Sequence, residues 1–199
     1  MDGDANFVEL IRQVRLGDSV AAERLVRQYE PAVRGAVRSR LTDPALKRQF
    51  DDEDLCQSVM GSFFIRAASG QYDLDVPQQL IALLTRMAHN KVSSKARYVR
   101  QQRRDERTTT GLDDLLAVVR STEADPQRQA AGRELLQKVM AAFTLEERRV
   151  AEFRAAGCSW NEVAQYAGGT AEARRKQLER ALSRVSQELG IDAWLADED

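Results

Sequence analysis

The chain has 199 residues, 43% hydrophobic and 31% charged, with a formal net charge of −1. This length can bury one large core or two small ones, and a composition with only four prolines favours a globular, helix-rich protein. Neither a leader pattern nor an apolar run of membrane length is evident, so we expect a cytoplasmic protein without membrane insertion. A single histidine and two distant cysteines, Cys56 and Cys158, argue against a metal site or a disulfide framework, and we expect no cofactor.

Two amphipathic helices are predicted at the start of the chain. Apolar residues share one helical face over 7–14 and again over 22–37, on either side of a break at Gly17. The segment that follows reads as a loop around Pro44. It leads to a helix that begins with the acidic run 51–54, where a helix amino terminus favours negative charge.

A long helix is predicted after a second break. Leu80, Leu84 and Met87 line one side of it, and its far end, 95–107, is polar and basic. No alternating strand pattern is found, so we predict an all-α fold. Cations on this helix could follow a phosphate backbone, and an aromatic and two polar side chains beside them could contact bases: Lys91, Lys95, Arg97, Arg100, Arg103 and Arg104, with Tyr98, His89 and Asn90.

Residues 105–127 mix Thr, Gly, Asp and Pro and are predicted to be a flexible linker. We therefore expect two small helical domains, 1–104 and 128–199. In the second, Thr144 is predicted to cap a helix with Glu147 as its capping-box partner.

The stretch "CSWNEVAQYAGGTAEARRKQL" predicts a helix-turn-helix. A short helix ends at Gly168, which can adopt a positive φ, and Thr170 can cap the next helix. The first turns of that second helix enter the DNA major groove in such motifs. Its candidate DNA-binding residues are Thr170, Glu172, Arg174, Arg175, Lys176, Glu179 and Arg180.

Both halves together resemble the extracytoplasmic-function (ECF) type of bacterial sigma factor. "DDEDLCQSVMGSFFIRA" and "LIALLTRMAHNKVSSKARYVRQQRR" are similar to two helices of the family's second region, and "FTLEERRVAEFRAAGCSWNEVAQYAGGTAEARRKQLERALSRV" is similar to its fourth region. The chain departs from the family pattern at three positions. Leu83 replaces a tryptophan, Ser94 replaces a frequent aspartate, and Arg174 stands where an aliphatic residue is usual.

The resemblance implies an alternative sigma factor that binds core RNA polymerase, through its clamp and flap regions, and promoter DNA. The front half would dock on the clamp and capture a melted downstream element, and the back half would read an upstream element as duplex. An anti-sigma partner is a further family expectation. The polymerase-binding residues implied are Asp51, Asp52, Glu53, Asp54 and Gln57.

Two other classes of function compete with a sigma factor. A helix-turn-helix regulator that binds operator DNA without polymerase would explain 158–189 equally well. It would not explain why the acidic run 51–54 and the cations between Lys91 and Arg104 occur in one chain. An enzyme is not expected, because phosphate loops, nucleophile sets and metal-ligand spacings are missing from the sequence.

Overall fold

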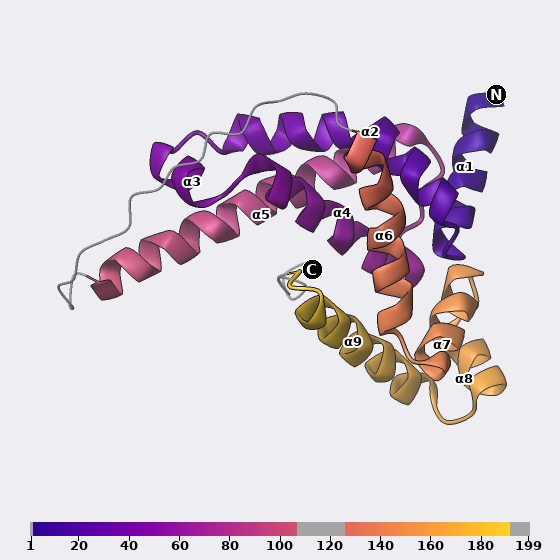
Figure 1. Cartoon of the computed structure of the whole chain (residues 1–199). Coiled ribbons are helices and arrows are strands. Elements are labelled where there is room, and N and C mark those ends of the chain that lie inside the picture. Colours follow the sequence, from indigo (N-terminus) through magenta and orange to yellow (C-terminus); the bar gives the residue numbers. More distant parts are fainter. Residues whose placement is uncertain (1, 107–125, 192–199) are drawn as a thin grey trace.

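The computed structural model describes residues 2–106 and 126–191, with side chains described over 5–101 and 131–191. Every element in these ranges is an α-helix, which confirms the predicted all-α class (Figure 1). The helices are α1 (Asp2–Arg15), α2 (Ser19–Arg40), α3 (Pro44–Gln49), α4 (Asp52–Ala68), α5 (Pro77–Glu106), α6 (Pro126–Ala142), α7 (Leu145–Ala155), α8 (Trp160–Ala167) and α9 (Ala171–Glu188).

Aspartate caps begin three of the helices in the front half. Asp18 caps α2, and Asp51 caps α4. Asp43 accepts a hydrogen bond from the Ala45 amide at 2.8 Å and begins α3 at Pro44. The segment predicted as a loop around Pro44 therefore contains a short helix, because an aspartate cap followed by proline is a helix start.

The front half is built around α2, which packs against α1, α4 and α5. Many apolar side chains of these helices are fully buried. Leu83 is also buried, so a leucine fills the core position at which the family pattern has a tryptophan. In Figure 1 the carboxy-terminal end of α5 extends away from the rest of the molecule. This leaves the basic part of α5 at one end of the fold.

The back half packs directly on the front half. α6 lies against α2 and α4 (Figure 1), and one continuous apolar core contains side chains from both halves. Gly132 allows the close approach of α6 to α2: a Cβ atom there would lie 2.9 Å from Val26 Cγ2. At Gly70, where φ is +67°, a Cβ atom would lie 2.6 Å from the backbone nitrogen of Ala155 in α7. The two halves therefore approach each other closely at both glycines, and a side chain at either position would clash with the opposite half.

The predicted linker 105–127 overlaps the ends of two helices. α5 continues to Glu106, and α6 begins at Pro126. The intervening residues, including the apolar patch at 115–119, and the acidic tail after Ile191 lie outside the described residues. The division into two domains remains a prediction.

Candidate polymerase and nucleic-acid interfaces

The segment predicted to be a helix-turn-helix contains α8, a short turn and α9. α8 ends at Ala167, and Gly168 and Gly169 have φ of 76° and 81°. Thr170 Oγ1 accepts a hydrogen bond from the Ala173 amide at 3.2 Å, which confirms the predicted cap of α9. The two glycines supply the left-handed backbone that reverses the chain between the helices.

Sequence reasoning missed the cap at the start of α8. Ser159 and Glu162 form a reciprocal capping box: the Glu162 amide donates to Ser159 Oγ at 3.3 Å, and the Ser159 amide donates to Glu162 Oε2 at 2.7 Å. The hydrogen bond with Ser159 lowers the pKa of the Glu162 carboxyl. The signal, a serine followed three residues later by glutamate, is present in the sequence. The predicted box of Thr144 and Glu147 is confirmed.

The outer face of α9 carries both signs of charge. The exposed residues of this face are Glu172, Arg175, Lys176, Glu179 and Arg180. Arg175 lies 3.1 Å from Glu172 and 3.6 Å from Glu179, and Lys176 lies 3.4 Å from Glu172. Arginine and lysine can bond guanine or phosphate, and glutamate can accept from cytosine, so this face has groups suited to a base-pair edge.

Arg174 does not belong to that outer face. Its side chain is only 15% exposed, and its guanidinium turns back toward the end of α8 and the start of α7. The prediction that Arg174 contacts DNA conflicts with this placement, because the side chain lies on the inner stripe of α9 with Leu178.

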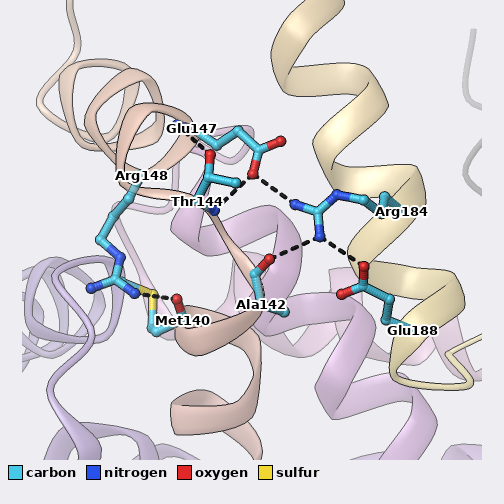
Figure 2. Close-up of polar contacts among 7 residues, drawn as sticks. All are labelled: Met140, Ala142, Thr144, Glu147, Arg148, Arg184 and Glu188. Carbon is cyan, nitrogen blue, oxygen red and sulfur yellow. Dashed lines mark hydrogen bonds and ion pairs between the residues drawn. The ribbon is translucent and has the colours of Figure 1, made fainter.

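A second arginine fixes α9 further along its length (Figure 2). Arg184 Nη1 donates to Ala142 O at 3.0 Å and to Glu188 Oε1 at 2.8 Å, and its Nη2 donates to Glu147 Oε2 at 2.7 Å. Figure 2 also shows Arg148 donating to the carbonyl of Met140. Carbonyl oxygens near the end of α6 thus accept hydrogen bonds from arginine side chains, because the last carbonyls of a helix have no amide partner within it.

A hollow of about 410 Å³ lies between α9 and the loop that joins α4 to α5. Gly70, Gln71 and Asp73 line it from the front half, and Arg175 and Glu179 line it from α9. Part of the outer face of α9 therefore borders the front half in this arrangement.

The basic end of α5 presents a smaller exposed set than the sequence predicted. Arg97 and Arg100 are exposed, and Tyr98 is 56% exposed. Lys95 is half-buried, with its Nζ 5.4 Å from the centre of the Phe50 ring. Arg97 Nη2 donates to Ser94 Oγ at 3.2 Å, at the position where the family has a carboxylate. The side chains of Arg103 and Arg104 lie outside the described residues.

Lys91 is not part of this surface. Its side chain is 1% exposed, so the prediction that it follows phosphates is corrected. The physical reason is helical phase: Lys91 lies four residues after Met87 and three after Ala88, and both of these are fully buried. His89 and Asn90 are half-buried near the middle of the same helix.

The acidic start of α4 combines a helix cap, an ion pair with α2 and exposed side chains. Asp51 Oδ1 accepts from the Glu53 amide at 3.1 Å as the cap of α4. Arg38 Nε donates to Asp52 Oδ2 at 2.5 Å, and Arg34 Nη1 lies 3.8 Å from the same oxygen. The exposed members on one side of the helix are Glu53, Asp54 and Gln57.

Two opposing effects act on the Asp52 carboxyl. Burial raises its pKa, but the hydrogen bond from Arg38 and the positive charges of Arg38 and Arg34 outweigh burial, so the pKa is lowered overall. Asp52 is therefore an ionised, paired group that joins α4 to α2. Sequence reasoning could not identify its partners, because they lie on another helix.

The two cysteines are free thiols. Burial raises the pKa of Cys56 to about 12. The described side chains hold no group of three or more His, Cys, Asp or Glu residues placed to bind a metal ion. Among the helices that the structure describes, none is long and apolar enough to span a bilayer.

The described helices thus present an acidic helix start on α4, a basic end on α5 and an outer face of mixed charge on α9. A family model described as ECF sigma factor matches residues 4–190. The chain belongs to the ECF sigma factor family, whose members are alternative sigma factors for RNA polymerase. Comparison with curated proteins and with solved structures gave no match, so the assignment rests on the family model.

Proposed function

We propose that this chain directs core RNA polymerase to promoters through three separate faces. The acidic start of α4 docks on the polymerase clamp, with the flap as a further contact of the enzyme. α9 reads the upstream promoter element as duplex, and the basic end of α5 binds the melted downstream strand. The observation that carries the proposal is the presence, in a chain of this family, of an exposed acidic face on α4, an exposed basic end on α5 and a charged outer face of both signs on α9.

The docking face is narrower than the full acidic run. Asp52 is half-buried in its pairing with α2, and Asp51 is the cap of α4; the side chains of Glu53, Asp54 and Gln57 are exposed on the following turn. Opposite charge on a basic partner would speed encounter and fix the orientation of docking. We therefore assign polymerase binding chiefly to these three exposed side chains.

The two DNA faces suit two forms of DNA. The outer face of α9 has charged groups on the first turns of a helix that follows a tight turn, as duplex readers do. The end of α5 combines exposed Arg97 and Arg100 with an exposed aromatic ring at Tyr98. Cations with a stacking surface suit unpaired bases.

Reading duplex with α9 requires more room than the hollow beside Arg175 provides, so we propose that the halves separate in the polymerase complex. Between Glu106 at the end of α5 and Pro126 at the start of α6, 19 residues of the predicted linker remain, and they could span at most about 63–68 Å when extended. One turn of DNA rises about 34 Å, so two elements one to two turns apart lie within reach of one chain.

Binding to core polymerase tests the proposal. The full chain is mixed with core enzyme and run on a sizing column, and affinity is measured for wild type and for Glu53→Lys/Asp54→Lys. We expect the reversal to weaken binding about tenfold or more near 0.1 M salt, with the difference shrinking at high salt. Asp75→Lys is the matched control, because Asp75 is an exposed carboxylate elsewhere in the same half.

Two outcomes would contradict the proposal. Equal affinity of the double reversal and wild type for core enzyme would remove α4 as the docking face. Tight, sequence-selective duplex binding by the free chain, without co-elution with core polymerase, would favour an operator-binding regulator instead.

A further inference from the structure

Arg174 occupies an unusual place in the turn between α8 and α9. It lies in the first turn of α9, after the Thr170 cap, and its side chain is 15% exposed. Its neighbours Arg175 and Lys176 are exposed on the outer face. Two adjacent arginines on one helix therefore have opposite environments.

The guanidinium of Arg174 is bonded on three sides. Nε donates to Gly168 O at 2.7 Å, and Nη2 donates to Ala167 O at 2.5 Å. Nη1 donates to Glu146 Oε1 at 2.5 Å and to Gln177 Oε1 at 2.6 Å. These four hydrogen bonds use most of the five N–H donors of an arginine. They connect the end of α8, the start of α7 and the body of α9.

The acceptors at the end of α8 need a donor from outside that helix. The last carbonyls of a helix have no partner within it, and the positive φ of Gly168 and Gly169 turns the following backbone away. A cation is also favoured at a helix carboxyl end, where the macrodipole is negative. The planar fork of arginine can serve two carbonyls and a carboxylate at once, which a lysine ammonium cannot do with the same geometry.

Glu146 completes the arrangement from α7. The hydrogen bond from Arg174, together with that from Gln177, lowers the pKa of the Glu146 carboxyl. The next residue, Glu147, receives Arg184 in the same way (Figure 2). The first turn of α7 thus holds α9 at two points along its length.

We propose that Arg174 is a positioning residue for the duplex-reading helix: it fixes the direction in which α9 leaves the turn and does not itself contact DNA. Arg175 and Lys176 then meet the groove at a set angle because Arg174 ties α9 to α8 and α7. This inference rests on the proposed function of α9 and adds to it a distinction between arginines that contact DNA and an arginine that orients them.

The test compares Arg174→Leu with Arg175→Leu in the full chain. The two variants make the same chemical change at adjacent positions, one facing inward and one facing outward. Glu146→Gln is a milder third variant that weakens the Arg174 contact and leaves the arginine in place. Each is first checked for native helix content, and all measurements are made well below its unfolding temperature.

The first measurement needs no DNA. Hydrogen exchange is followed at the backbone amides of Ala173 and Arg174, which donate to Thr170 Oγ1 at 3.2 Å and to Thr170 O at 3.0 Å, and in the last turn of α8. We expect at least tenfold faster exchange in Arg174→Leu, a smaller increase in Glu146→Gln, and no change in Arg175→Leu. Unchanged exchange in Arg174→Leu would overturn the inference, because an arginine that does not hold the turn cannot position the helix.

The second measurement uses the complex with core polymerase. A duplex is selected from a randomised pool by the wild-type complex, and its affinity is compared with that of a scrambled duplex at several salt concentrations. We expect Arg174→Leu to lose about tenfold in discrimination with an unchanged salt slope. Arg175→Leu should reduce the slope by about one unit if it contacts a phosphate.

A slope reduced by about one unit in Arg174→Leu would show that Arg174 itself binds DNA, and would overturn the inference. Full discrimination in that variant would also overturn it. If the wild-type complex selects no duplex, the proposed reading by α9 fails, while the exchange measurement still decides whether Arg174 holds the turn.

Discussion

Removing one side chain from α6 is expected to destabilise the whole chain, including the front half. Leu136 is 0% exposed and belongs to the core that both halves share. Leu136→Ala deletes buried methyl groups and leaves a cavity, which costs about 2–5 kcal/mol in the free energy of unfolding. A loss of that size lowers the equilibrium protection of globally exchanging amides roughly 30- to 4,000-fold.

Native-state hydrogen exchange measures this effect residue by residue. If the free chain unfolds as one unit, the slowest amides of α2, such as those of Leu25 and Val33, lose the same factor as those of α9. Lys138→Ala is the control, since Lys138 is an exposed residue on the same helix and its loss should change stability by less than about 0.5 kcal/mol. If α2 keeps its wild-type protection while α6 and α9 lose theirs, the halves unfold independently and the reasoning from a shared core is wrong.

Three further predictions concern single groups. Thr144→Ala removes the cap of α7 and should cost about 1 kcal/mol, measured as a lower midpoint of urea unfolding; Thr144→Ser, which keeps the hydroxyl, should recover most of it. Pairing with Arg38 lowers the pKa of Asp52, so the stability that this carboxylate contributes is complete above the ordinary carboxyl pKa and is lost as the pH falls through the lowered pKa. The free energy of unfolding of Asp52→Asn should therefore fall less steeply than that of wild type between about pH 5 and pH 2. Parallel curves for the two proteins would contradict this. With its pKa raised to about 12 by burial, Cys56 should resist a thiol reagent at pH 8 until the chain is denatured, whereas Cys158 is half-buried and should react first; rapid labelling of Cys56 in the native chain would refute its burial.

Local features of the fold were readable from the sequence because they depend on neighbouring residues. Thr144 caps α7 with Glu147, Gly168 adopts a positive φ, and Thr170 caps α9, all as predicted. These interactions involve residues within a few positions of each other, so spacing alone identifies them. The helix at Pro44 carries the same kind of local signal, an aspartate cap followed by proline, although a loop is predicted there from the sequence.

The features that were not predicted depend on residues distant in sequence. Lys91 and Arg174 are exceptions: Lys91 lies four residues after Met87 and Arg174 lies four residues before Leu178, so helical spacing already indicates that both face inward, although their charge suggests the opposite. Asp52 is paired by α2, and nothing near it in the sequence marks that partner. Gly132 would weaken an isolated helix, and its use appears only when α2 lies against it. The candidate surfaces were therefore predictable from the sequence, but the tertiary structure was needed to decide which residues belong to each surface.

Two arginines of α7 that donate to backbone carbonyls would influence DNA binding in a way that a count of cations does not anticipate. Arg148 donates to Met140 O, and Arg154 donates to Cys158 O, so both direct their donors at neutral backbone and retain a full positive charge. That charge acts over roughly a Debye length of 8–10 Å and can attract an approaching polyanion. It displaces few condensed counterions in the final complex, because the side chain is not free to meet a phosphate. The association rate with DNA would therefore reflect more cations of the back half than the salt dependence of the DNA-binding equilibrium does.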